Sequence, residues 1–282
     1  MLTLAVVNRA ETFERMDSPL ADRGIELVHV PATDRSFSLS SDASTLAGVD
    51  PDAIDVGFVY PGRLMEGAVL DAILDVPWVN GRDAVLTSRN KAGVIARLDR
   101  AGIPVPETIM LSSPVDEDEV LRAADRLGYP VVVKPNSTTR GTGVARAGDA
   151  DSLLGIWDYL DLVHDYWATG DKSFLLQEFL PDARDYRAMV LDGEYVGAVE
   201  RRLPGAAGDG ETPPDRWKHN VHRGAEATGV TLDDDRRELV EDVADVLGID
   251  FLGVDLLATD DRTVVTETNA RPTIDAATKY EP

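Results

Sequence analysis

Two carboxylates and an amide near the end of the sequence have the spacing of a metal site. The segment GVDLLATDDRTVVTETN, residues 253–269, contains two strand-like runs around a turn centred near Asp261. A hairpin with this centre places Asp255 directly opposite Glu267, with Asn269 two residues further along the same face. Carboxylate and amide oxygens suit Mg²⁺, which usually takes one or two protein carboxylates and completes its shell with water and phosphate oxygens. The alternatives are a slipped register or a solvated acidic edge.

The predicted pairing of Asp255 with Glu267 has an energetic consequence. Like charges directly opposite each other destabilise a sheet, so something must offset the repulsion. From the sequence alone, we expect Asp255→Asn to stop the metal chemistry and to leave the ligand-free protein equally or more stable.

A second hairpin is predicted around the two-residue turn Asp192-Gly193. Regular pairing sets Asp185 opposite Glu200, with Arg187 on the same face. Carboxylates can bind ribose hydroxyls, and arginine can bind phosphate oxygens. The alternative is an exposed ladder of ion pairs that contributes little stability.

A glycine-containing loop follows a strand in the middle of the chain. The segment YPVVVKPNSTTRGTGVARAG ends its strand on Lys134 and then presents Gly141 and Gly143. Small residues let backbone N–H groups approach phosphate oxygens, and the lysine adds a positive charge. An ordinary hairpin loop is the alternative, because the loop runs into a strand-like segment and lacks the dinucleotide-binding spacing.

The elements that position these residues follow from the hydrophobic pattern. Short apolar runs at residues 2–7, 25–30, 55–60 and 76–79, with a helical stripe at 69–74, predict parallel β-α-β units. A helix capped by Ser88 carries Lys91 in its first turn and ends at Gly102, and another begins at Ser113-Pro114 and ends before Gly128. A strand at residues 131–133 follows. The last third is antiparallel, with a loop at 203–215 that we expect to be mobile and a helix at 236–247.

Composition excludes several classes of protein. The 282 residues carry 51 acidic and 28 basic side chains, a formal charge of −23 that repels nucleic acid and anionic membrane surfaces. No apolar run approaches the ~20 residues of a membrane span, and we expect a cytoplasmic protein. There is no cysteine, hence no disulfide or thiolate zinc site. The acidic excess is typical of halophilic proteins, and only five of the basic residues are lysines.

The motifs together resemble a known family. Lys91, V-V-V-K-P with its glycine loop, Q-E-F-L, D-Y-R, G-V-D-L-L and E-T-N have the order and spacing of ATP-grasp enzymes over nearly the whole chain. E-R-R at residues 200–202, followed by W-K-H-N-V-H-R-G-A at 217–225, is similar to RimK-type α-L-glutamate ligases and to relatives that attach amino acids to carriers or coenzyme tails. Asn90 stands where these enzymes usually have Asp.

The resemblance implies a role for each matching residue. ATP would be bound by Lys91, Lys134, Gly141, Gly143, Gln177, Glu178, Phe179, Leu180 and Asp185. Two Mg²⁺ ions, or Mn²⁺, would be bound by Asp255, Glu267 and Asn269. The γ-phosphate and the substrate carboxylate would be lined by the catalytic residues Arg187, Arg202, Lys218, Asn220 and Arg223.

The resemblance also implies an architecture and an activity. We expect an α/β ATP-grasp fold with a Rossmann-like lobe at residues 1–84, an ATP-grasp N-terminal subdomain with a small α+β lid at 85–177, and a C-terminal antiparallel lobe at 178–282. The implied activity is Mg²⁺-dependent ligation of a glutamate-like amino acid to a protein, coenzyme or carrier acceptor through an acyl phosphate, with a homo-oligomer left open. The alternatives are an ATP-binding regulatory protein and a phosphotransferase.

Overall fold

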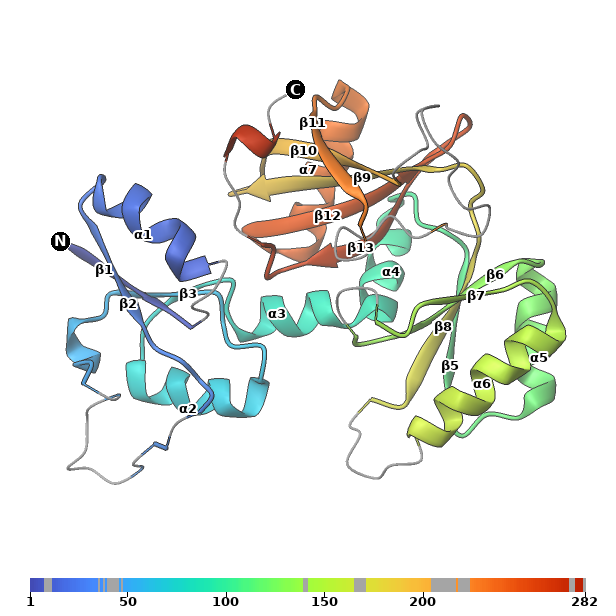
Figure 1. Ribbon diagram of the computed structural model, residues 1–282, viewed down its shortest axis with the longest axis horizontal. Coiled ribbons are helices and arrows are strands. Elements are labelled where there is room, and N and C mark those ends of the chain that lie inside the picture. The colour runs from blue at the N-terminus through green and yellow to red at the C-terminus, as the bar shows by residue number, and fades with distance from the viewer. Residues whose placement is uncertain are drawn as a thin grey trace.

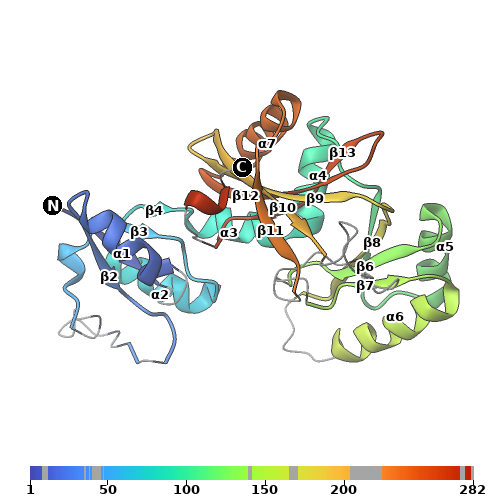
Figure 2. The ribbon, with the colours of Figure 1, turned by 45° about the horizontal axis from the view of Figure 1, so that its top comes forward.

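The computed structural model contains three β-sheets, arranged from one end of the molecule to the other (Figure 1). It describes residues 1–7, 12–34, 36–37, 39, 46, 48–138, 142–164, 171–203, 217, 224–273 and 277–280. The first sheet stands apart, and the two others lie close together in both views (Figures 1 and 2). Among the described residues, no helix has the length and apolar character needed to cross a membrane.

The first sheet is parallel, as the sequence predicts. It has the strand order β2-β1-β3-β4 and contains β1 (Leu2–Val6), β2 (Ile25–His29), β3 (Val56–Phe58) and β4 (Trp78–Val79). Its helical elements are α1 (Glu14–Ala21), the 3-10 turn η2 (Pro51–Ala53) and α2 (Leu64–Leu74). The predicted helical stripe lies in α2, where Leu70 and Leu74 are buried.

Two helices lead from the first sheet to the rest of the molecule. They are α3 (Arg82–Arg89) and α4 (Lys91–Arg100), and α3 crosses between the lobes in Figure 1. The prediction that Ser88 caps the second helix is wrong. Asn90 is the N-cap, because its side chain accepts a hydrogen bond from the Gly93 amide at 3.0 Å, whereas Ser88 is buried in the last turn of α3. Lys91 lies in the first turn of α4, as predicted.

The second sheet has the order β5-β8-β6-β7, and all its pairs are antiparallel. It contains β5 (Thr108–Ser112), β6 (Val131–Pro135), β7 (Ala145–Ala147) and β8 (Ser173–Glu178), with α5 (Glu117–Leu127) and α6 (Ala150–His164) on one side. The helix predicted from Ser113 begins three residues later, after the N-cap Asp116, and ends at Gly128, whose φ of +78° suits glycine.

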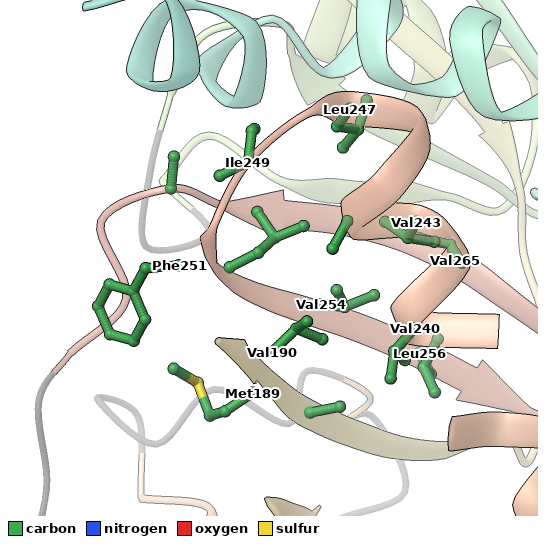
Figure 3. Close-up of a cluster of buried hydrophobic side chains, with 14 of the residues drawn as sticks. Met189, Val190, Val240, Val243, Leu247, Ile249, Phe251, Val254, Leu256 and Val265 are labelled. Atoms are coloured by element: carbon green, nitrogen blue, oxygen red, sulfur yellow. The ribbon is translucent and has the colours of Figure 1, made fainter. Parts of the chain in front are cut away.

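The third sheet carries most of the predicted site and has the order β11-β10-β9-β12-β13. Its strands are β9 (Arg184–Leu191), β10 (Glu194–Arg202), β11 (Glu226–Val230), β12 (Phe251–Ala258) and β13 (Thr263–Asn269), accompanied by α7 (Asp234–Leu247) and the 3-10 turn η4 (Ala277–Tyr280). Val240, Val243 and Leu247 of α7 pack on Val254 and Leu256 of β12 (Figure 3). One face of the sheet is therefore core, and alternate residues point to the other face.

Asn80 joins the first sheet to the third. Its buried side chain donates to the carbonyl oxygens of Phe251 and of Ala270, the latter at 2.6 Å, and accepts from the Phe251 amide at 3.1 Å. These bonds satisfy backbone groups at the start of β12 and just after β13. The boundaries expected at residues 84 and 177 stay predictions.

The register of the hairpin β12–β13 is confirmed where it matters for the site. Asp255 pairs with Glu267 and Gly253 pairs with Asn269. Beyond Asp255 the register shifts by one residue, so that Leu256 pairs with Val265.

The register predicted for the hairpin β9–β10 is wrong after its first two pairs. A bulge between Tyr195 and Gly197 inserts Val196, so Asp185 pairs with Arg201 rather than with Glu200. A one-residue shift moves every following side chain of β10 to the other face of the sheet. Glu200 therefore faces away from Asp185.

Candidate functional site

The candidate site lies on the face of the third sheet that is opposite to α7. Strand alternation places Asp185 and Arg187 of β9, Arg201 of β10, and Asp255 of β12 on that face. Glu267 and Asn269 of β13 share it through the confirmed register. The end of β6 and the start of α4 approach the same strand β13 through Lys134 and Lys91.

The negative charge of Asp255 is offset by two arginines. Arg187 donates from Nε and Nη2 to the two carboxylate oxygens at 2.7 Å each, and Arg201 Nη2 lies 3.4 Å from Oδ2. Burial alone would raise the pKa of Asp255, but the two guanidinium groups lower it. Burial alone would lower the pKa of Arg187, but the Asp255 carboxylate reverses that effect and raises it. The repulsion expected at Asp255 is therefore offset by arginines of the same sheet, Arg187 of β9 and Arg201 of β10.

Arg201 also links Asp255 to the predicted ribose ligand. Its Nε donates to Asp185 Oδ1 at 3.0 Å, and its side chain is only 13% exposed. Arg201 is not among the predicted site residues, since the family resemblance implies Arg202 instead. The bulge at Val196 is the physical reason, since it exchanges the faces of these two neighbours.

Arg202 lies on the opposite face in a separate ion-pair cluster. Arg202 Nη2 donates to Glu200 Oε2 at 2.6 Å, and Arg184 donates to both oxygens of the same carboxylate at 2.9 Å. The hydrogen bonds from Arg184 and then Arg202 lower the pKa of the buried Glu200 to about 2. The structure thus does not bring Arg202 together with Arg187.

The two predicted phosphate-binding lysines converge on β13. Lys91 Nζ lies 3.5 Å from Glu267 Oε1 and donates to the backbone oxygens of Asn136 and Thr138. Lys134 Nζ donates to Gln177 Oε1 at 2.9 Å and to the Thr266 carbonyl at 3.4 Å. Both lysines are buried, which is unusual for this residue type and points to a functional role.

Burial lowers the pKa of Lys134 to about 8. The Glu267 carboxylate acts against this shift, and the charge of Lys91 adds to it. Within the described residues Lys134 has no direct carboxylate partner, and an anionic ligand would stabilise its charged form.

Two asparagines explain why Lys91 is held where it is. Asn136, which directly follows β6, accepts from the Ala92 amide at 2.8 Å through its side chain and from the Lys91 amide at 3.3 Å through its backbone. Asn90 caps the Gly93 amide of the same turn. Asn136 thereby fixes the first turn of α4 to the second sheet, a contact that is not apparent in the sequence, and Asn90 satisfies a further amide of that turn.

Four residues predicted to bind ATP lie at the end of β8 and directly after it: Gln177, Glu178, Phe179 and Leu180. Gln177 Nε2 donates to Thr108 Oγ1 at 2.8 Å, while its oxygen accepts from Lys134. Glu178 accepts from the Glu107 amide at 2.8 Å and from Arg262 at 2.6 Å, which ties the second sheet to the turn between β12 and β13. Phe179 packs edge-on against Trp217 with ring centroids 5.8 Å apart, and Leu180 is half-buried beside it in sequence.

Several predicted residues lie outside the described part of the chain: Gly141, Lys218, Asn220, Arg223 and most of the predicted loop at 203–215. Gly143 is described and has φ +78°. A Cβ there would lie 2.7 Å from Pro135 Cγ, so this position requires glycine on two grounds.

The donor set fits a hard divalent cation. Asp255 and Glu267 supply carboxylate oxygens, and the buried amide nitrogen of Asn269 has no hydrogen-bond partner in the described part of the chain. Turning that amide would direct its oxygen toward a ligand. The described residues contain no group of three or more His, Cys, Asp or Glu suited to a metal. Water and phosphate oxygens would therefore complete the shell, as is usual for Mg²⁺.

Comparison with known sequences identifies relatives over most of the chain. The RimK-like ATP-grasp domain family matches residues 88–281. A probable alpha-L-glutamate ligase of Legionella pneumophila (strain Corby) is 30% identical over 203 residues, which cover 71% of this chain and 61% of that protein. The chain thus spans less than two thirds of that relative. The alpha-aminoadipate–LysW ligase LysX of Sulfurisphaera tokodaii is 30% identical over 88% of this chain and 82% of its own.

Comparison with solved structures gives the same fold. A RimK domain ATP-grasp protein from Sphaerobacter thermophilus has a TM-score of 0.67 at 24% identity, over 94% of this chain and 90% of its own. The D-alanine–D-alanine ligase of Bacillus anthracis has 0.69 at 16%, over 99% and 91%. The ATP-grasp ligase PsnB, solved with a minimal precursor, Mg and ADP, has 0.69 at 15%, over 98% and 94%. These likenesses confirm the expected fold class.

Proposed function

The chain belongs to the RimK-like ATP-grasp family, and from that membership and the site we propose that it is an ATP-dependent carboxylate–amine ligase. One observation carries the proposal. Two buried lysines from different elements, Lys91 of α4 and Lys134 of β6, face a strand that carries Glu267 and Asn269. Cations from separate elements around paired carboxylates are an arrangement that suits a metal–triphosphate group.

The reaction has two steps. A carboxylate oxygen of the acceptor attacks the γ-phosphorus of ATP, and ADP leaves with the electron pair of the broken P–O bond. The amine nitrogen of the second substrate then attacks the acyl carbon, loses a proton, and expels phosphate. The products are an amide, ADP and phosphate.

The residues divide this work by position. Lys91 and Lys134 would bind the phosphates from the α4 and β6 sides, and Asp185 would hold the ribose. Asp255, Glu267 and Asn269 would hold Mg²⁺ or Mn²⁺, which when bound neutralises charge on the transferring phosphoryl group. Arg187 and Arg201, held by Asp255, would contact the γ-phosphate and the substrate carboxylate.

The class of substrate, but not its identity, is inferred from the names of two relatives. The two curated relatives are named as ligases of glutamate and of α-aminoadipate, which share a second carboxylate. We propose a glutamate-like amino acid and a protein, coenzyme or carrier acceptor. Lys218, Asn220 and Arg223 are proposed to complete the substrate side.

Release of ADP tests the proposal. Purified protein with Mg²⁺ and ATP is incubated with pools of amino acids and cell metabolites, and products are identified by mass. A ligase gives a product equal to two substrates minus water. A phosphotransferase gives a stable phosphorylated product, and a regulatory ATP-binding protein binds ATP without releasing ADP. Either of the last two results would contradict the proposal.

Lys134→Ala should abolish ADP release while the protein stays folded. The substitution removes a proposed phosphate contact, and among the described residues the side chain of Lys134 bonds to Gln177 of β8 and to the Thr266 carbonyl of β13. Lys172→Ala, just before β8, is the matched control and should retain activity. ADP release by Lys134→Ala at the wild-type rate would contradict the role of this lysine.

A further inference from the structure

A cavity of about 510 Å³ lies where the first sheet meets the third sheet, and the proposed function does not use it. Its wall combines residues of α2, of β4, of the first turn of α3, and of the turn between α7 and β12. Gly248, which caps the end of α7, belongs to that wall. The cavity is therefore separate from the proposed ATP site, which lies on the face of the third sheet opposite to α7. Its volume is in the range that holds small organic molecules.

The cavity wall carries more negative than positive charge. Its charged side chains are three carboxylates, Asp71, Asp83 and Asp250, and one cation, Arg82. Arg82 lies 3.9 Å from Asp83, so these two charges offset each other. Asp83 also supplies the acidic residue that the N-terminus of α3 favours. Within the described residues neither Asp71 nor Asp250 forms an ion pair, which leaves two carboxylates from different lobes on one cavity.

A buried hydroxyl without a hydrogen-bond partner lies behind this wall. Tyr60 is fully buried, and its hydroxyl bonds to no group in the described part of the chain. The ring packs edge-on against Trp78 with centroids 5.4 Å apart, and its hydroxyl end lies against Gly67, one turn before Asp71. Burial raises the pKa of Tyr60, the charge of Asp71 adds to this, and that of Arg82 opposes it. Both charges belong to the cavity wall, so an occupant of the cavity would supply the missing partner.

Trp78 holds one of the two carboxylates in place. Its Nε1 donates to Asp71 Oδ1 at 2.8 Å, which leaves the second oxygen of Asp71 able to accept from a ligand. Trp78 itself is half-buried and lines the cavity. Aromatic rings attract ammonium and guanidinium groups, so the indole and the carboxylate favour the same kind of ligand.

The cavity suits an organic cation better than a metal ion. The described residues contain no group of three or more His, Cys, Asp or Glu side chains suited to a metal. The cavity is also far larger than a metal ion requires. Ammonium groups are donors only, and carboxylates are acceptors only, so two ammonium groups would match Asp71 and Asp250.

We propose that this cavity binds a small organic cation of the diamine type, with one ammonium group at Asp71 and the other at Asp250. The first ammonium group lies beside Trp78 and the Tyr60 hydroxyl. Because the two carboxylates belong to α2 and to the turn before β12, the bound cation ties the first lobe to the start of β12. This site goes beyond the proposed ligase function and does not depend on it.

Calorimetric titration of the full-length protein tests this inference. The probes are 1,4-diaminobutane and 1,5-diaminopentane, and their neutral counterparts are 1,4-butanediol and 1,5-pentanediol. The titrations are made in about 1 M KCl, where screening within about 3 Å suppresses general attraction of cations to the acidic surface. At least one diamine should bind wild type at least tenfold more tightly than its diol.

Two substitutions that each remove one carboxylate locate the bound diamine. Asp71→Asn is a mild change, because the amide oxygen can still accept from Trp78 Nε1. Asp71→Asn and Asp250→Asn should each weaken diamine binding at least fivefold. Asp75→Asn, exposed at the end of the same helix α2, is the matched control for loss of one charge and should leave binding unchanged.

The carboxylates of the proposed metal site are the competing location for a cation. A saturating non-hydrolysable ATP analogue with Mg²⁺ should leave diamine binding unchanged, because Asp255 and Glu267 lie on the other face of the third sheet. Displacement of the diamine by the nucleotide would place it at that site and overturn the inference. A wild type that binds no diamine, or that binds the diols equally well, would overturn it too. Wild-type affinity in either Asp71→Asn or Asp250→Asn would do the same.

Discussion

At the scale of single residues, the central feature is a carboxylate that already has cationic partners. Asp255 is bonded by Arg187 and approached by Arg201, while Lys91 lies beside Glu267. The repulsion expected between Asp255 and Glu267 is therefore offset by three basic side chains. Phosphates that enter the site would meet cations already held in place, which lowers the cost of organising them.

This arrangement reverses the stability expected for Asp255→Asn from the sequence. The change would leave Arg187, whose side chain is 28% exposed, without its carboxylate. Breaking a buried ion pair typically costs 3–5 kcal/mol, and partial exposure reduces this to about 2 kcal/mol. We expect turnover to fall by several orders of magnitude and the ligand-free protein to lose stability.

Urea unfolding without ligands and ADP release on one preparation measure both effects of Asp255→Asn. Asp261→Asn, in the turn of the same hairpin, is the control for loss of one charge. A variant that is inactive but as stable as wild type would show that the two arginines find solvent or other partners, contrary to this account.

At the scale of elements, the two faces of β10 have separate tasks. One face presents Arg201 to the site, and the other presents Glu200 to Arg184 and Arg202. The bulge at Val196 decides which residue falls on which face.

The Glu200 cluster predicts a specific dependence of stability on pH. Its folded pKa of about 2 lies below the ordinary value of 4.5, so the stabilisation is present above pH 4.5 and is lost as pH falls through about 2. Glu200→Gln should lower the free energy of unfolding by up to about 3 kcal/mol at neutral pH, and the difference from wild type should vanish near pH 2.

Denaturant unfolding at several pH values measures this difference. Glu194→Gln, exposed at the start of the same strand, is the control and should follow wild type. A constant gap between wild type and Glu200→Gln from pH 7 to pH 2 would show that the carboxylate charge is not the cause.

Features that depend on a local pattern could be predicted from the sequence. Features that depend on one inserted residue, such as the strand register after the bulge, could not. The parallel sheet and the pairing of Asp255 with Glu267 follow from apolar periodicity and turn position, which are local. The bulge at Val196 has a weaker signal, Gly197, a glycine inside the strand with φ +157°. Apolar alternation alone fits either register, so it does not reveal the extra residue. The contact of Asn136 with the first turn of α4 joins distant segments and has no local signal. The cap by Asn90 is local, but Ser88 is an equally suitable residue type two positions earlier.

At the scale of the whole molecule, the net charge of −23 governs the response to salt. Dilution from about 2 M to about 0.1 M KCl extends the screening length from about 2–3 Å to about 10 Å and restores repulsion between surface carboxylates. We therefore expect the thermal midpoint to fall on dialysis to low salt. Equal midpoints across this range would contradict the halophilic interpretation.

The bulge at Val196 in β10 also constrains how this sequence can evolve. Val196 is 57% exposed and is not one of the proposed ligand-binding residues, so we expect most residue types to be tolerated there. Its deletion would be another matter, because Arg201 and Arg202 would exchange faces. Selection among descendants of this chain should therefore tolerate changes of residue type at position 196 but act strongly against its deletion. The length of a strand can thus be under tighter selection than its composition.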